Sequence, residues 1–373
     1  MGVHGAVRQW RVLEGLLRAC RLDGGPDEVA RWSTEFWPQA VEGARTLRLL
    51  PQLASVAVRG RVLPELPDGL GPGVLAQRAG LSWQGVLWQA RCRNRERNRL
   101  LLEQGEEVLA ALAAAGVRAA GLKGLHLLRA GSWPDPAARE MRDLDVLVAP
   151  ADLDAAREVL AELHYRPATA DGYGRLADDH HDLALSRPGA PGTVELHRAL
   201  LARDHARELD TAAVLERITP DGFLDDADAF LHVVAHAQLQ DAGRLMAQPP
   251  LRAVLDGAWL LRAGRAGTAP QHRARSGPAL RRALAVHLRD TAVVAGWPDS
   301  AAAHGGWWWR MRWLAGLAVA SSPRWAPLYQ DVCLAPRTLN ASRIAQLYDV
   351  PAHGVPLARA RAAYVGRALA RRR

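Results

Sequence analysis

Two aspartates, two residues apart, are the first sign of chemistry in this chain. Asp143 and Asp145 open the apolar run Asp143–Val148, and residues i and i+2 of a β-strand face the same side. Two neighbouring carboxylates repel each other, so both stay ionised cheaply only when a cation lies between them. Proteins usually bind Mg²⁺ through one or two carboxylates together with substrate phosphates. The pair therefore predicts a site for Mg²⁺ or Mn²⁺.

A third carboxylate strengthens this prediction. The segment 193–197 alternates polar and apolar residues, so Glu195 shares one face with Thr193 and His197. If this strand neighbours the aspartate strand, Glu195 completes a three-carboxylate metal site. Asp182 is the competing third carboxylate, and Glu195 is favoured because it lies in the middle of a cleanly alternating strand. Such a set suits two ions, one activating an attacking hydroxyl and the other stabilising a leaving pyrophosphate.

The only lysine of the chain lies just upstream of the aspartates. Of the 48 basic residues, 47 are arginine, and the exception is Lys123 in the segment Gly121–Gly124. This segment closes a predicted strand and opens a helix, where backbone N–H groups bind anions and a glycine permits close approach. A flexible ammonium adds a mobile charge for a β- or γ-phosphate. Gly121, Lys123 and Gly124 are therefore predicted to contact phosphate.

The elements that position these residues form a small α/β unit between two helical regions. Hydrophobic periodicity predicts an α+β fold with a mixed sheet, a helical region at 1–105, a catalytic α/β unit at 106–205 and a second helical region at 206–373. The strands are expected at 117–122, 143–149, 181–186 and 193–198. The helices are expected at 89–115, 125–130, 150–163, 227–240, 251–261, 280–295 and 307–320.

Composition excludes several other classes of protein. Three widely spaced cysteines argue against a disulfide framework or a zinc ribbon, and favour a reducing cytoplasm. The absence of a signal-peptide core or a long apolar run predicts a protein without a membrane partner. The net charge of +9 is compatible with RNA but comes largely from an arginine bias, including the arginine-rich tail at 359–373. P-loop, dinucleotide-binding and hydrolase-elbow motifs do not occur in the chain.

The motifs resemble those of a known superfamily. Gly121–Gly124, Trp133–Val148 and Val194–His197 look like the nucleotidyltransferases, and most like the bacterial "uncharacterised nucleotidyltransferase" family. The resemblance covers roughly residues 90 to 265. The broader superfamily usually carries Gly-Ser or Gly-Gly at the phosphate-binding turn, so Leu122-Lys123-Gly124 departs from its pattern.

The resemblance implies a role for each candidate residue. Asp143 and Asp145 would be metal ligands, Glu195 the third carboxylate, and Gly121–Gly124 the phosphate-binding turn. His232 and His236, four residues apart on one predicted helical face, would line the floor of the cleft together with Asp256. From the residues themselves, the alternative for both histidines is burial with a backbone or carboxylate partner. Arg139 and Arg142 could contact a triphosphate, although an arginine next to an acid is as often structural.

The function expected from these residues is metal-dependent nucleotidyl transfer. An acceptor hydroxyl would attack the α-phosphate of an NTP, and pyrophosphate would leave. Family resemblance favours a peptide natural product or a small metabolite as the acceptor over RNA. Two alternatives stay open: transfer of another group, such as a sugar, from a nucleotide donor, and a non-catalytic protein that binds nucleotide or RNA.

Overall fold

A computed structural model describes residues 3–63, 82–168, 184–241, 251–296, 351 and 353–370. Within these ranges the fold is α+β, a mixed five-stranded sheet flanked by helices, which confirms the predicted class. Three features of the sequence lie outside the described residues, namely the predicted helix at 307–320, Asp182 and Cys333. Cys20 and Cys92 are free thiols.

The sheet places the two carboxylate-bearing strands side by side. Its order is β1-β2-β5-β4-β3, and β5 pairs in parallel with β2, whereas the other pairs are antiparallel. The register sets Asp145 opposite Glu195, which is the neighbourhood that a three-carboxylate site requires. The strands are β1 (Ala119–Gly121), β2 (Asp143–Val148), β3 (Arg166–Pro167), β4 (Leu185–Ser186) and β5 (Thr193–His197).

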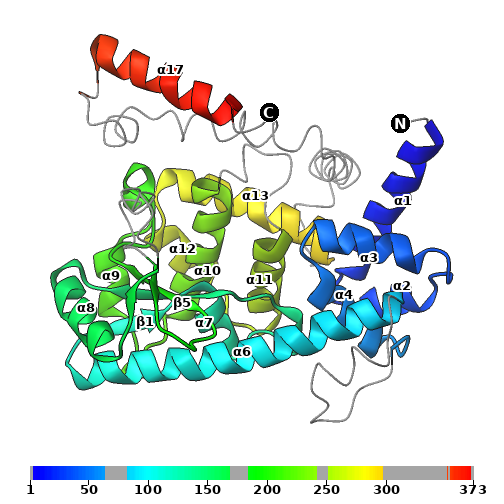
Figure 1. The fold of residues 1–373 in the computed structure, drawn as a ribbon, viewed down its shortest axis with the longest axis horizontal. Coiled ribbons are helices and arrows are strands. Elements are labelled where there is room, and N and C mark those ends of the chain that lie inside the picture. Colours follow the sequence, from blue (N-terminus) through cyan, green and yellow to red (C-terminus); the bar gives the residue numbers. More distant parts are fainter. Residues whose placement is uncertain are drawn as a thin grey trace.

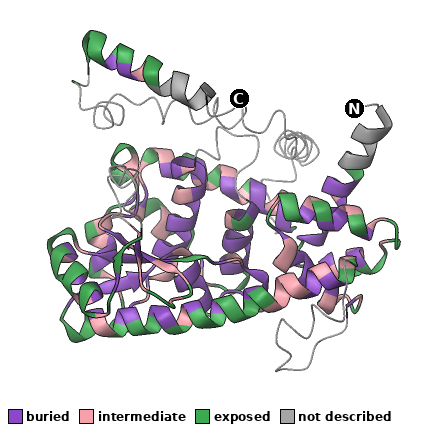
Figure 2. Cartoon of the chain, in the orientation of Figure 1, coloured by how far each residue is buried: buried purple, intermediate pink, exposed green. Residues whose placement is uncertain are grey.

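One long helix joins the sheet to the N-terminal region. This helix, α6 (Trp83–Ala114), begins where the Ser82 side chain accepts a hydrogen bond from the Gly85 amide. From Asn94 onward its buried residues recur every three or four positions, so one face packs inward while the other is exposed (Figure 2). Figure 1 shows α6 running below both the sheet and the N-terminal helices. These are α1 (Val3–Ala19), α2 (Gly25–Ala30), α3 (Trp37–Thr46) and α4 (Leu50–Arg59).

Helices also pack around the sheet and above α6. Two of them interrupt the strands in sequence, namely α7 (Lys123–Arg129) and α8 (Leu153–Glu162). The following region contains α9 (Thr211–Glu216), α10 (Asp226–Ala235), α11 (Leu251–Arg262), α12 (Ala269–Arg275), α13 (Pro278–Ala295) and α17 (Gly354–Ala370). Nearly every residue of α10 is buried, and α10 packs against α7, α11 and α13. The helix α10 is therefore a central element of the core.

The predicted elements differ from the observed ones mainly at their ends. The strand expected at 117–122 is reduced to the three residues of β1, and α7 begins at Lys123 rather than at residue 125. The edge strand β3 was not predicted from the sequence. A π-helical turn, His236–Gln240, ends the helix predicted at 227–240.

No helix in the described ranges is long and apolar enough to cross a membrane.

Candidate active site

Asp145 lies at the centre of the candidate site, in the interior of β2. Asp145 is only 4% exposed, and its Oδ1 atom accepts two hydrogen bonds. One comes from Lys123 Nζ at 2.8 Å and the other from His197 Nε2 at 2.7 Å. Although burial raises the pKa of Asp145, Lys123 and His197 outweigh burial and hold this pKa well below its ordinary value. Asp145 is therefore a buried carboxylate that stays ionised.

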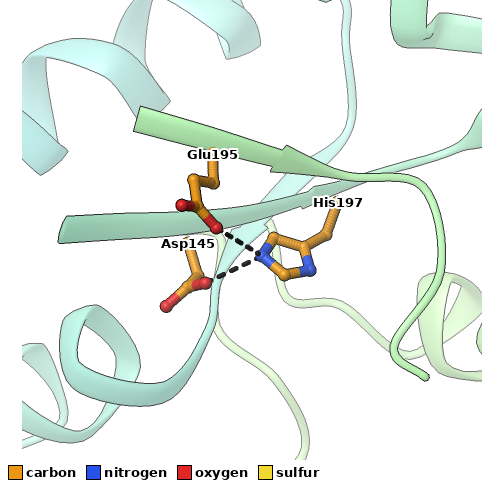
Figure 3. A group of neighbouring side chains, drawn as sticks. All are labelled: Asp145, Glu195 and His197. Atoms are coloured by element: carbon orange, nitrogen blue, oxygen red, sulfur yellow. Dashed lines mark hydrogen bonds and ion pairs between the residues drawn. The ribbon is translucent and has the colours of Figure 1, made fainter. Parts of the chain in front are cut away.

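Two neighbours on β5 complete a compact group of possible metal ligands. Glu195 is the direct register partner of Asp145, and His197 lies two residues further along the same face. Figure 3 shows the three side chains converging, with Glu195 Oε2 4.0 Å from His197 Nε2. One donor atom from each of the three residues lies within 4.8 Å of the others. The group thus offers two carboxylates and one imidazole to a single ion.

Lys123 reaches this group from the first residue of α7. Its backbone φ is 44°, in the left-handed region, which costs a residue with a side chain on the order of 1–2 kcal/mol. Burial lowers the pKa of Lys123, but the charge of Asp145 and the hydrogen bond to it raise this pKa above its usual value. The ammonium is therefore charged and serves as a counter-ion to Asp145.

Asp143 lies on the same face of β2, but at its exposed start. Desolvation and the charge of Asp145 raise the pKa of Asp143, while Lys123 and Arg252 partly oppose this rise. Asp143 is therefore close enough to Asp145 to feel its charge, although it is not a member of the compact group. Arg252, an exposed residue at the start of α11, is a cation beside the site that the sequence did not reveal.

The two arginines predicted to contact phosphate have carboxylate partners in the structure. Arg139 forms a buried two-bond ion pair with Asp256, with N–O distances of 2.8 and 2.9 Å. Trp133 donates a third bond to the same carboxylate. Arg142 is exposed and pairs with Glu140. Contact of either arginine with a triphosphate stays a prediction, and Arg142 is the more accessible of the two.

Both glycines of the predicted phosphate-binding turn have a packing role. A Cβ on Gly124 would lie 2.5 Å from Arg139 Nη1 and 2.8 Å from Met141 Sδ. A Cβ on Gly121 would lie 2.8 Å from the Leu125 side chain. A larger residue at either position would therefore displace a neighbouring side chain, whether or not the backbone there contacts phosphate.

Of the two histidines of the predicted cleft floor, His232 is fully buried and near the site. Burial, followed by the charges of His236, Lys123 and His197, holds the pKa of His232 well below its ordinary value. Its Nε2 atom has no hydrogen-bond partner among the described residues. His236 instead is half-buried, and its Nδ1 atom lies 3.1 Å from Asp241 Oδ2.

The sequence already contained the signal that points to His197. Alternation along 193–197 places His197 on the face of Glu195, but a histidine at a strand end is equally compatible with a packing role. Only the parallel register with β2 brings its Nε2 atom to Asp145.

Comparison with known proteins then identifies the family. A model of a family described as "uncharacterised nucleotidyltransferase" matches residues 32–284, about two thirds of the chain. The chain belongs to this family. No curated protein and no solved structure matched. Membership in the family confirms the resemblance drawn from the motifs and supports nucleotidyl transfer as the general chemistry.

The matched region contains every residue of the compact group, as well as Lys123 and the Arg139–Asp256 ion pair. It also includes α3 and α4, which precede the α/β unit. The family's sequence pattern therefore extends well beyond the strands and turns that carry the candidate site.

Proposed function

We propose that this protein transfers a nucleoside monophosphate from an NTP to an acceptor hydroxyl, with release of pyrophosphate. The single observation that carries the proposal is the convergence of Asp145, Glu195 and Lys123 on adjacent elements of a member of a nucleotidyltransferase family. A peptide natural product or a small metabolite is the acceptor class we favour.

The residues present fit a divalent cation. Asp145 is a buried, ionised carboxylate whose charge is balanced in the structure by Lys123 and which also accepts a hydrogen bond from His197. Glu195 and Asp143 bring further negative charge to the same face. We assign Asp143, Asp145 and Glu195 to Mg²⁺ or Mn²⁺, as the ligand preferences of these ions suggest. When bound, the metal would lower the pKa of an attacking hydroxyl and offset charge on the leaving pyrophosphate.

Lys123 would exchange partners during substrate binding. Its ammonium now neutralises Asp145 at 2.8 Å, but a bound cation would repel it from that carboxylate. The side chain is flexible and 28% exposed, so it can turn toward the β- or γ-phosphate of the incoming NTP. In this way a single side chain stabilises the site before binding and contacts the substrate afterwards.

Glu195 is the residue best placed to act on the acceptor. It is half-buried, whereas its register partner Asp145 is almost fully buried. A carboxylate that keeps contact with solvent can accept a proton from an acceptor hydroxyl and pass it to water. We therefore assign Glu195 to activation of the nucleophile and Asp145 to charge and position.

Labelled nucleotides test the reaction type. The protein is incubated with each of the four NTPs, labelled at the α- or the γ-phosphate, and with a panel of hydroxylated peptides and metabolites. Nucleotidyl transfer predicts α-label in the acceptor and γ-label in pyrophosphate, and both must disappear with Asp145→Asn. Label from the γ-phosphate in the acceptor, or a sugar adduct by intact-mass spectrometry with nucleotide-sugar donors, would show that another group is transferred.

A further inference from the structure

We propose that His197 is a direct metal ligand through Nε2, and that this nitrogen shifts the preference of the site from Mg²⁺ toward Mn²⁺. The inference rests on the proposed function, because it concerns the ion held by the same carboxylates. It adds a ligand that the paired-carboxylate pattern does not contain.

The distances around His197 fit one shared ion. Its Nε2 atom lies 2.7 Å from Asp145 Oδ1 and 4.0 Å from Glu195 Oε2. Two ligands of one ion, each about 2.1 Å from it, are separated by about 3 Å when adjacent and about 4.2 Å when opposite. The observed separations fall near this range, so small side-chain movements suffice to bring all three atoms onto one ion (Figure 3).

The protein also fixes the His197 ring in place. The residue is 1% exposed and lies at the end of β5, in register with the buried Leu147 of β2. A buried ring on a paired strand has few alternative rotamers, and a ligand held rigidly loses little entropy when it binds metal. His197 is therefore preorganised toward the carboxylates rather than free to turn to solvent.

The chemistry of the nitrogen explains the expected metal preference. Mg²⁺ prefers oxygen ligands and keeps several waters, so an imidazole adds little to its binding. Imidazole nitrogen binds first-row transition metals well, and a set dominated by carboxylate and phosphate oxygen suits Mn²⁺ among them. Two carboxylates with one imidazole thus favour Mn²⁺ over Mg²⁺.

Binding requires a change in the protonation of the ring. In the structure, Nε2–H donates to Asp145, or a protonated ring does so. The ligand form carries its hydrogen on Nδ1 and leaves the Nε2 lone pair for the metal.

The competing role is that His197 only orients Asp145 through the hydrogen bond. Loss of such an orienting group also lowers metal affinity about 10- to 100-fold, so affinity alone does not separate the two roles.

Pulsed electron paramagnetic resonance separates the two roles directly. Mn²⁺ is added to the full-length protein, and electron spin echo modulation from a directly bound nitrogen is recorded, first with natural-abundance ¹⁴N and then with ¹⁵N-labelled histidine. The wild type is expected to show nitrogen modulation that changes with the label. His197→Gln should abolish it and reduce the ratio of Mn²⁺ to Mg²⁺ affinity on the order of tenfold. The matched control, His236→Gln, should leave both unchanged.

The outcomes distinguish failure of this inference from failure of the proposed function. Mn²⁺ bound to the wild type without histidine modulation, or modulation that persists in folded His197→Gln, would overturn the inference and leave the carboxylate site intact. Mn²⁺ that binds no better to the wild type than to Asp145→Asn, with or without NTP, would overturn both. If His197→Gln does not fold, His232→Gln decides the assignment, since loss of modulation in that variant would assign the nitrogen to His232 instead.

Discussion

Asp145 has three partners in the candidate site: Lys123, His197 and Glu195. Its Oδ1 atom accepts hydrogen bonds from Lys123 and His197. Its pairing with Glu195 places a second carboxylate on the same face of the sheet. A buried carboxylate is costly unless its charge is paired and its lone pairs are bonded. The two cationic or donating partners therefore allow an ionised carboxylate to exist in the core before any metal arrives.

Removal of the Lys123 charge is expected to strengthen metal binding and weaken nucleotide binding. In Lys123→Met the ammonium no longer competes for Asp145 Oδ1, so Mn²⁺ affinity without nucleotide should rise about tenfold, or ~1.4 kcal/mol. The KM for NTP should increase because a phosphate contact is lost. Calorimetric titration of Mn²⁺ and steady-state kinetics measure the two effects. Weaker Mn²⁺ binding in this variant would contradict the counter-ion role.

Lys123→Arg tests whether a compact ammonium is needed. Arginine keeps the charge but presents a wide, planar group, and the residue occupies a left-handed backbone position that aims the side chain at Asp145. We expect kcat/KM to fall at least tenfold while the protein stays folded by circular dichroism. Activity equal to the wild type would mean that any cation serves at this position.

Single residues were predictable from the sequence where local periodicity places them. Asp145 and Glu195 follow from alternation along two strands, and Lys123 from its position at a strand end. The ion pair of Arg139 with Asp256 spans 117 positions of sequence, so no local pattern reveals it. His197 needed the register of β2 and β5, which depends on tertiary structure.

At the level of elements, the Arg139–Asp256 pair ties the segment before β2 to α11. Both residues are almost fully buried, and the amides of Asn94 and Asn98 on α6 donate to the Arg139 carbonyl. Gly124 of α7 packs directly against the Arg139 guanidinium. Three helices therefore converge on the chain just before the aspartates, which fixes where β2 begins.

Breaking this pair is expected to destabilise the whole fold. Arg139→Met leaves the Asp256 carboxylate buried, with Trp133 as its remaining side-chain donor in the described part of the chain. Loss of one partner of a buried pair costs about 3–5 kcal/mol. Urea denaturation measures the free energy of unfolding. The control is Arg142→Met, which removes an exposed arginine from the same segment and should cost less than about 0.5 kcal/mol. Equal losses of stability in the two variants would show that the Arg139–Asp256 pair does not stabilise the fold.

Long elements were easier to predict than short ones. Helix α6 has 32 residues, with a regular buried face from Asn94 onward, and β5 alternates polar and apolar residues. In β2 the Asp-x-Asp pair opens an apolar run. By contrast, β3 has only two residues, too few for a period to be recognised. Strand β4, also of two residues, lies at the end of the strand expected at 181–186.

At the scale of the whole molecule, buried histidines make stability sensitive to acid. Burial, helped by Arg265 and Arg129, lowers the pKa of His126 to about 4, and burial lowers that of His287 to about 4. Well above pH 6.5 these rings are neutral in both the folded and unfolded states. Between pH 6.5 and about 4 the unfolded chain binds protons that the folded core excludes, so stability falls as the pH falls.

Replacement of His126 by leucine is expected to reduce this acid sensitivity. From pH 7.5 to 5.0, one such histidine costs the wild type on the order of 2 kcal/mol, and His126→Leu removes that contribution. Urea denaturation of both proteins at the two pH values measures the difference. An unchanged loss of stability in the variant would show that His126 does not remain neutral in the folded protein.

We expect the Asp145 group to hold a metal together with a nucleoside triphosphate. Isothermal titration of ATP, GTP, CTP and UTP, each with and without Mg²⁺ or Mn²⁺, tests it on the wild type, on Asp145→Asn and on Asp143→Ala/Asp145→Ala. The wild type should bind at least one triphosphate in a metal-dependent way, and both variants should lose this binding. Absence of metal-dependent binding of any nucleotide or nucleotide sugar, or equal binding by Asp145→Asn, would contradict it.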